Sequence, residues 1–316
     1  MRALVEAGCL PVAVDQARGN VVLCPVLDLS FREPSFGAAV VALGSRPVRL
    51  VPIPAFRAFA DALTGAELGP PAGMIAHVGR CGSTLLANLV GLGADTVVLK
   101  EPSVLAPTDP GLARALLRFC RAVVASAGRE LVVKPTSWTC PALLAAASPA
   151  GGGEGPGARW LLVWREPEAA VRSLCATPPD WADSPACRAE LARLAGRVPD
   201  EPAARYAAHW SAIVDAFLAA PPSDVRFLDY RALTADKPDA LRRTQRWFGL
   251  RDAGGTLPAG FDAEAGRYSK ATDGTRFDPA AAHHRPGLPA PDAELVALGT
   301  GAARAALRDL PPARVL

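Results

Sequence analysis

The stretch Met74-Ile-Ala-His-Val-Gly-Arg-Cys-Gly-Ser-Thr-Leu-Leu86 passes from a short apolar segment through two glycines into a segment that is typical of a helix. Gly79 and Gly82 permit a tight turn, and the N–H groups at the start of a helix attract an anion, because they face it together with the positive end of the helix dipole. Further hydrogen-bond donors come from the side chains of Arg80, Ser83 and Thr84. The stretch therefore predicts a strand, a phosphate-binding loop and a helix in direct succession.

From this stretch onward, short apolar strands alternate with helical segments. Strands are predicted at Met74–Val78, Thr96–Leu99, Glu130–Val133, Trp160–Trp164 and Val225–Leu228, and helices at Ser83–Leu92, Gly111–Ala127, Pro167–Ala176 and Ala203–Ala219. This alternation is typical of a parallel sheet with helices on both faces, in which ligands bind at the carboxyl ends of the strands. We therefore expect an α/β domain of the P-loop type over residues 71–316.

The first seventy residues have a different pattern. Strand-like runs at Pro11–Val14, Asn20–Val26, Ala38–Leu43 and Val48–Val51 are separated by glycine, proline and aspartate, and an amphipathic helix is predicted at Ala55–Leu63. The stretch Gly65–Gly73, which contains Gly69-Pro70-Pro71, is the predicted linker. Residues 1–70 are therefore predicted to form a small β-rich N-terminal subdomain.

The composition narrows the class of protein. The chain has 316 residues, of which 50% are hydrophobic and 21% are charged, as in a globular protein. Its formal net charge of +3 is too small to indicate binding to nucleic acid or to an anionic membrane, so any basic site must be local. The basic residues that cluster around predicted strand ends fit a small anionic ligand; they are Arg80, Lys100, Lys134, Arg165 and Arg172.

Cysteine usage and the absence of long apolar runs give further expectations. The seven cysteines are an odd number without a C-x-x-C pair, so they predict neither a zinc site nor a disulfide framework. The adjacent His283 and His284 lack further ligands at a useful spacing, and we expect no metal. The segment Met1–Val14 contains Glu6 and has no apolar run long enough to predict a signal peptide, and no 18 uncharged apolar residues follow one another. We therefore expect a cytoplasmic protein without a membrane partner.

A second anion site is predicted where the strand Trp160–Trp164 ends. Ser173 lies eight residues after Arg165, about two helical turns further on, so that both side chains can face one phosphate above the strand end. The alternative is that Arg165 pairs with Glu166 or Glu168 at the surface and that Ser173 is an ordinary helix residue.

The segment Gly79-Arg80-Cys81-Gly82-Ser83-Thr84-Leu85-Leu86 resembles the 5′-phosphosulfate loop of the sulfotransferase superfamily, and Arg165 with Ser173 resembles its 3′-phosphate motif. The resemblance extends over about Met74 to Leu250 and is strongest to the carbohydrate and tyrosylprotein branches, which tolerate arginine where cytosolic members have lysine in the loop. It implies that a sulfuryl group is transferred from the co-substrate 3′-phosphoadenosine 5′-phosphosulfate (PAPS). By analogy with phosphoryl transfer, we expect fixed cations and N–H donors to be sufficient for this reaction without a metal. The implied PAPS-binding residues are Gly79, Arg80, Cys81, Gly82, Ser83, Thr84, Leu85, Arg165 and Ser173.

The resemblance also implies the catalytic residues. In those branches a glutamate about twenty residues after the loop is the general base, and Glu101 lies twenty-one positions after Arg80. Lys134, which ends a predicted strand before Pro135, and Arg80 would stabilise negative charge on the leaving phosphate oxygen or on the transferring group. The alternatives are that Glu101 only pairs with Lys100 or another base, and that Lys134 is a snorkelling lysine at a strand end.

The C-terminal region and the acceptor are less defined. The segment Arg267–Thr275 is interpreted as a basic loop that closes over the nucleotide, with Lys270 as its contact, or as an ordinary polar loop. Acceptor pockets in this superfamily are built from variable loops and helices, here expected in the N-terminal subdomain, Ser103–Pro110 and Thr177–Pro202. We expect a small-molecule acceptor, such as a specialised metabolite or a saccharide, sulfated at a hydroxyl or amine. The sequence leaves the oligomeric state open.

Two other functions compete with a sulfotransferase. A P-loop kinase or nucleotide hydrolase needs a lysine in the loop and an aspartate that holds Mg²⁺. No lysine precedes Ser83, although Asp229, which follows an apolar strand, could be the aspartate. A non-catalytic nucleotide-binding module would keep the fold and bind a partner through its N-terminal segment.

Overall fold

The computed structural model describes residues 1–27, 33, 35–42, 44, 46–105, 109–147, 158–221, 223–251, 256–267 and 292–316. Five parallel strands form the central sheet in the order β5-β6-β4-β7-β8. Their bounds are β4 Gly73–His77, β5 Thr96–Lys100, β6 Glu130–Lys134, β7 Arg159–Trp164 and β8 Val225–Asp229. Each strand begins within one residue of its predicted start, and the predicted α/β fold class is confirmed.

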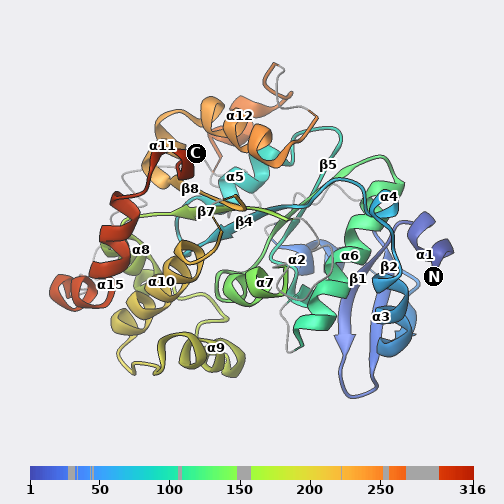
Figure 1. Cartoon of the computed structure of the whole chain (residues 1–316), viewed down its shortest axis with the longest axis horizontal. Coiled ribbons are helices and arrows are strands. Elements are labelled where there is room, and N and C mark those ends of the chain that lie inside the picture. The colour runs from blue at the N-terminus through green and yellow to red at the C-terminus, as the bar shows by residue number, and fades with distance from the viewer. Residues whose placement is uncertain are drawn as a thin grey trace.

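Helices cover both faces of this sheet (Figure 1). Helices α5 (Ser83–Val90) and α12 (Lys237–Phe248) lie on one face, and α6 (Pro110–Ser126), α7 (Cys140–Ala147) and α10 (Pro202–Leu218) lie on the other. Every residue of β4, β5 and β6 is buried, which explains why these strands are continuous apolar runs in the sequence.

The strand order fixes where a ligand can bind. The chain leaves β4 toward β5 at one edge of the sheet, whereas it leaves β7 toward β8 at the other edge. Connections that diverge from adjacent strands create a switch point, and ligands of open α/β sheets bind there, outside the carboxyl ends of the strands. The loop that follows β4 therefore lies where an α/β fold builds its site.

The C-terminal helix α15 (Ala293–Arg308) packs against α10 and against α8 (Pro167–Ala176). Pro167 occupies the first turn of α8 as predicted, where its missing N–H is not needed. Arg304 of α15 forms ion pairs with Glu166 at 2.6 Å and with Glu168 at 2.5 Å. These pairs anchor α15 at the start of α8, next to the carboxyl end of β7.

The N-terminal region contains a small antiparallel sheet in the order β1-β2-β3, with bounds Cys9–Asp15, Asn20–Pro25 and Arg49–Pro52, followed by α3 (Ile53–Asp61). The strand predicted at Ala38–Leu43 is wrong, because α2 (Phe36–Ala42) occupies this stretch. Phe36 and Ala39 are buried one helical turn apart, a helical spacing that a short run of alanine and valine does not reveal.

The predicted linker Gly65–Gly73 also holds regular structure. The short helix α4 (Gly65–Leu68) begins with a capping box, in which Thr64 and Glu67 satisfy each other's backbone and side-chain groups, and β4 starts at Gly73. The remaining described elements are α1 Arg2–Glu6, α9 Pro185–Ala195, α11 Tyr230–Ala235, α13 Phe261–Ala265, and the 3-10 turns η1 Ser103–Leu105, η2 Ser137–Thr139 and η3 Pro312–Arg314.

One hydrophobic core runs from the N-terminal sheet into the central sheet. Helix α6 joins the two parts, because β1 and α3 both contact it. Phe56 of α3 and Phe119 of α6 are both fully buried, and their ring centroids lie 5.0 Å apart.

In the described part of the chain, no helix has both the length and the apolar character that crossing a membrane requires.

The turn that starts α5 depends on a glycine. Gly82 has φ +81°, and a Cβ there would meet Leu233 and the ring of Tyr230 at 3.0 Å, whereas Gly128 has φ +69° and nothing within 4 Å. We expect Gly128→Ala to lower the free energy of unfolding by about 1 kcal/mol through backbone strain alone. Gly82→Ala should lower the free energy of unfolding by more than this, because its Cβ also comes too close to Leu233 and Tyr230. Urea unfolding of both variants tests this, and equal losses would contradict it.

Candidate functional site

The loop between β4 and α5 has a strained backbone. Gly79, Arg80 and Gly82 all have positive φ, at +85°, +52° and +81°, and Gly82 precedes α5 without a capping side chain. The first bond within the helix runs from the N–H of Leu86 to Gly82 O, so the N–H groups before it have no partner inside the helix. Ser83 and Thr84 are buried in this first turn. The loop thus has the form of an anion-binding cradle.

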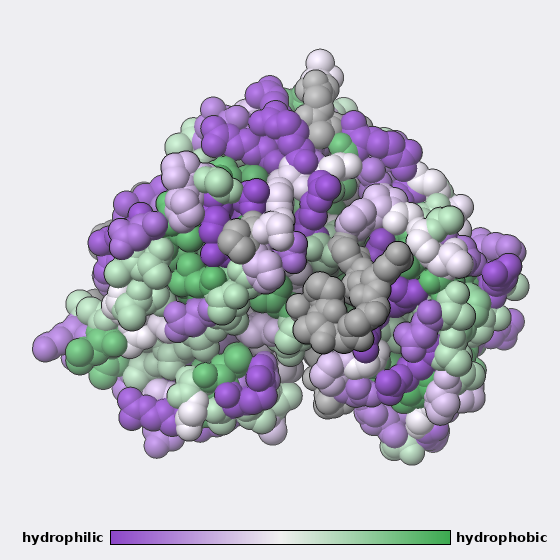
Figure 2. Space-filling view, in the orientation of Figure 1, coloured by the Kyte–Doolittle hydropathy of each residue, from purple (hydrophilic) through white to green (hydrophobic). Residues whose placement is uncertain are grey.

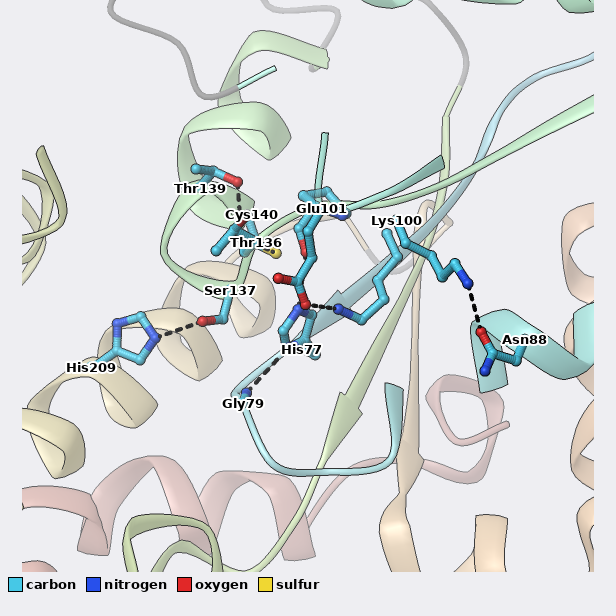
Figure 3. A network of polar contacts seen from close by, with 12 residues as sticks. His77, Gly79, Asn88, Lys100, Glu101, Thr136, Ser137, Thr139, Cys140 and His209 are labelled. Atoms are coloured by element: carbon cyan, nitrogen blue, oxygen red, sulfur yellow. Dashed lines mark hydrogen bonds and ion pairs between the residues drawn. The ribbon is translucent and has the colours of Figure 1, made fainter. Parts of the chain in front are cut away.

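His77, the last residue of β4, fixes this loop and was not predicted from the sequence. Its Nδ1 accepts a hydrogen bond from the N–H of Gly79 at 3.2 Å (Figure 3), and its Nε2 lies 2.9 Å from Pro135 O. With these partners Nε2 carries the proton, so the buried ring is neutral. His77 therefore ties the cradle to the end of β6. The partner is 58 residues away in the chain, and no local pattern could have revealed it.

Glu101 and Lys134 meet at the carboxyl ends of β5 and β6. Lys134 Nζ lies 2.5 Å from Glu101 Oε1, a contact drawn as the dashed line at the Glu101 carboxylate in Figure 3. The N–H of Glu101 also donates to Lys134 O at 2.6 Å. The side chain of Lys134 is 1% exposed, whereas that of Glu101 is 27% exposed. Lys134 is therefore not a snorkelling lysine, and the ion pair of Glu101 is formed with Lys134. The glutamate is the member of the pair that solvent or a substrate can reach.

Backbone strain coincides with the candidate catalytic residues. Among the described residues, Arg80 and Glu101 are the two non-glycine residues with positive φ, at +52° and +49°. Each costs about 1–2 kcal/mol relative to ordinary backbone, and such residues cluster at functional sites, where the surrounding structure holds them. For Glu101 the holding contacts are the two hydrogen bonds to Lys134.

Lys100 was predicted to be a local cation or an alternative partner of Glu101, and in the structure it belongs to a partly buried polar chain. Its Nζ donates to Asn88 Oδ1 at 2.9 Å, and Asn88 Nδ2 donates to Glu264 Oε1 at 2.7 Å. Lys100 is also the register partner of Lys134, so the two ammonium groups lie on the same face of adjacent strands. Burial lowers the pKa of Lys100 to about 8, and Glu264 opposes this shift.

Arg165 joins the cradle from the carboxyl end of β7. Its Nη1 donates to Arg80 O at 3.2 Å, and its guanidinium carbon lies 4.6 Å from the ring centroid of Tyr230. Trp210 on α10 donates its indole N–H to Arg165 O at 3.0 Å. Glu166 and Glu168, the alternative partners predicted for Arg165, pair instead with Arg304 of α15. The structure thus brings Arg165 to the phosphate loop.

Helix α8 runs beside the same loop. Ser173 is partly buried on α8, and its neighbour Leu174 approaches to 3.6 Å of the point where Gly79 would carry a Cβ. Arg80 donates from its guanidinium to Thr177 O at the end of α8. The elements that carry Arg165 and Ser173 therefore flank the cradle on one side, while Lys270, His283 and His284 lie outside the described residues.

Cys81 and Leu85 complete the predicted loop residues. Cys81 is buried, its Sγ lies 3.1 Å from Val163 O, and burial raises the pKa of its thiol. A raised pKa keeps the thiol protonated, so Cys81 fills space under the loop and is not a reactive thiolate. Leu85 is partly buried and packs against the core. In the part of the chain that the structure describes, no group of three or more His, Cys, Asp or Glu is arranged to hold a metal ion.

A second buried histidine lies next to this site. His209 on α10 contacts Ser137 Oγ through Nε2 at 3.1 Å (Figure 3), and its ring centroid lies 5.5 Å from that of Trp181. Burial lowers the pKa of His209 to about 4, so the ring is neutral at physiological pH. Ser137 follows Lys134 by three residues, and this contact supports the segment after β6.

No family model matches the chain, and no curated protein matches its sequence. Among solved structures, it is similar to the sulfotransferase domain from the curacin biosynthetic pathway, over 77% of this chain and 99% of that chain, with 14% identity and a TM-score of 0.42. It is also similar to sulfotransferase STF1 from Mycobacterium tuberculosis H37Rv, over 78% of this chain and 82% of that chain, with 15% identity and a TM-score of 0.44. Similarity at this level does not by itself assign a function.

The lowered pKa of His209 predicts that the protein becomes less stable as the pH falls below about 6.5. In the unfolded chain His209 takes up a proton below pH about 6.5, whereas in the folded protein its ring stays neutral down to pH about 4. The folded state is therefore favoured fully above pH about 6.5, and its free energy of unfolding decreases as the pH falls toward about 4. Between pH about 7 and about 5 the wild type should lose roughly 2 kcal/mol more than His209→Gln does. Urea unfolding at both pH values measures the difference. An equal loss in the two proteins would show that His209 titrates normally in the folded state.

Proposed function

We propose that the chain is a sulfotransferase, which moves a sulfuryl group from PAPS to a hydroxyl or amine of a small-molecule acceptor. The observation that supports this function is the convergence of three groups at one edge of the sheet. They are the cradle at the start of α5, the Arg165 guanidinium that contacts it, and the Lys134–Glu101 pair. An anion-binding loop, an additional cation and a reachable carboxylate are the parts that metal-free transfer of an anionic group requires.

In the proposed complex, the loop from Gly79 to Leu85 holds the 5′-phosphosulfate through backbone N–H groups and the side chains of Arg80, Ser83 and Thr84. Arg165 and Ser173 hold the 3′-phosphate, and Lys270, which lies outside the described residues, is the further proposed nucleotide contact. Arg165 is oriented for this role by its stacking on Tyr230 and its bond to Arg80 O. A guanidinium that is already held in place loses little conformational entropy when it binds a phosphate.

The proposed transfer proceeds without a covalent enzyme intermediate. The acceptor oxygen attacks sulfur and forms the new S–O bond, the bond from sulfur to the bridging phosphate oxygen breaks, and its electron pair stays on that oxygen. Glu101 takes the acceptor proton. The Lys134 ammonium, at 2.5 Å from Glu101, can turn from the carboxylate to the bridging oxygen, where it stabilises the developing charge together with Arg80.

A kinase or nucleotide hydrolase fits these contacts less well. Asp229, its candidate Mg²⁺ ligand, caps α11 by accepting the N–H of Arg231 at 2.9 Å. It ends β8, which β7 separates from β4, so it lies about 10 Å across the sheet from the strand that carries the loop.

The proposed location of the protein is a reducing compartment such as the cytoplasm. The buried free thiols of Cys9, Cys24 and Cys81 support this location.

Glutamate-to-glutamine substitution separates binding from catalysis. We expect Glu101→Gln to lower the rate of PAP (3′-phosphoadenosine 5′-phosphate) formation from PAPS by roughly 10²- to 10⁴-fold with a panel of alcohols, phenols and amines, because it removes the base. Calorimetric affinity for PAP should change little, since the loop and Arg165 remain. Glu294→Gln, at an exposed position in the first turn of α15, is the matched control and should behave as the wild type. Unchanged turnover in Glu101→Gln would exclude Glu101 as the base.

A further inference from the structure

A cavity of about 320 Å³ lies between the N-terminal sheet and the segment that follows Glu101. Val14 of β1 forms one wall, Ser103 and Val104 of η1 form a second, and Leu112 of α6 forms the third. The two elements β1 and α6 lie side by side (Figure 1). The volume is at the lower end of the range of about 300–1,000 Å³ for small-molecule sites.

The position of this cavity relates it to the candidate base. Ser103 is two residues after Glu101, so its Cα lies within about 7 Å of that of Glu101. A larger cavity of about 550 Å³ is lined by Trp160 and Asp224, at the amino ends of β7 and β8. Trp160 is four residues before the end of β7, about 13 Å from the edge that carries the candidate site. Of these two cavities, the smaller is therefore the better placed to present a ligand to Glu101.

The described lining of the smaller cavity offers no cation to an anionic ligand. Its walls are formed mostly by valine, leucine and alanine, and among the described residues that line it none carries a positive charge. Asp109 is the one charged side chain, but its carboxylate already accepts the N–H of Gly111 at 2.8 Å and pairs with Arg57 at 2.8 Å. The polar groups besides it are neutral, on Gln16 and Ser103. A charge buried here without a partner would be costly.

We propose that this cavity is the acceptor site and that the acceptor is a small, uncharged alcohol or phenol with an apolar body. The inference rests on the proposed sulfotransferase function and gives the N-terminal sheet a role in acceptor specificity. The apolar body packs between Val14 and Leu112, and its hydroxyl extends toward Glu101. Carboxylates are excluded because the described lining offers them no cation, and protonated amines are disfavoured because Asp109 is already paired with Arg57.

Three probes of similar shape and different charge test this proposal. Naphthol is neutral, naphthoate is an anion and naphthylmethylamine is a cation at neutral pH. Each is titrated by calorimetry into the full chain saturated with PAP, and naphthol is also assayed for sulfation with PAPS. The test variant is Val14→Trp, which fills the cavity from the half-buried strand β1. The control is Val22→Trp, at a half-buried position of β2 outside the lining.

We expect naphthol to bind the wild type and Val22→Trp alike, to bind Val14→Trp at least about tenfold more weakly, and to bind more tightly than either charged probe. PAP should bind the wild type and both variants with equal affinity, and this result would show that the two variants are folded. If PAP binds but naphthol does not, or if Val14→Trp leaves naphthol binding unchanged, or if a charged probe binds best, the acceptor assignment is overturned while the proposed function stands. If the wild type fails to bind PAP, the proposed function and the acceptor site fall together.

Discussion

The reversal of the chain between β4 and α5 is the constraint on which the rest of the site depends. Within five residues the backbone must leave the centre of the sheet and start a helix whose first turn faces the strand ends, and it does so through positive φ at Gly79, Arg80 and Gly82. His77 stabilises this strained path, because its ring accepts the N–H of Gly79 and also contacts Pro135 O. One side chain therefore connects the loop to the end of β6.

Each of the two buried lysines near the loop is connected to a carboxylate. Two lysines at the register-paired ends of β5 and β6 are both almost fully buried, and a buried ammonium needs a compensating group. Lys134 has the Glu101 carboxylate, and Lys100 reaches Glu264 through Asn88. The hydropathy colouring in Figure 2 shows hydrophilic and hydrophobic residues interspersed over the visible face. The cationic character that matters for an anionic donor is therefore local and largely internal, in agreement with the small net charge of the chain.

The sequence predicted the features that depend on local pattern. The five strands of the central sheet were predicted because strands covered on both faces are continuous apolar runs, and α8 was predicted with its bounds because Pro167 marks its start. The prediction was wrong at α2, where a short run of alanine and valine gave no period, and the capping box of α4 was overlooked in a stretch rich in glycine and proline. The roles of His77 and Asn88 depend on partners distant in the chain, which a single sequence does not reveal. The contact expected from Lys270 stays a prediction.

The measurement that tests the central claim most directly is a calorimetric titration of the wild type and Arg165→Ala with PAP, and of the wild type with ATP and Mg²⁺. The proposed donor site predicts micromolar binding of PAP to the wild type, at least about tenfold weaker binding to Arg165→Ala because a charged hydrogen bond to phosphate is lost, and no metal-dependent binding of ATP. Binding of ATP that requires Mg²⁺, without binding of PAP, would contradict the account and favour a kinase or nucleotide hydrolase.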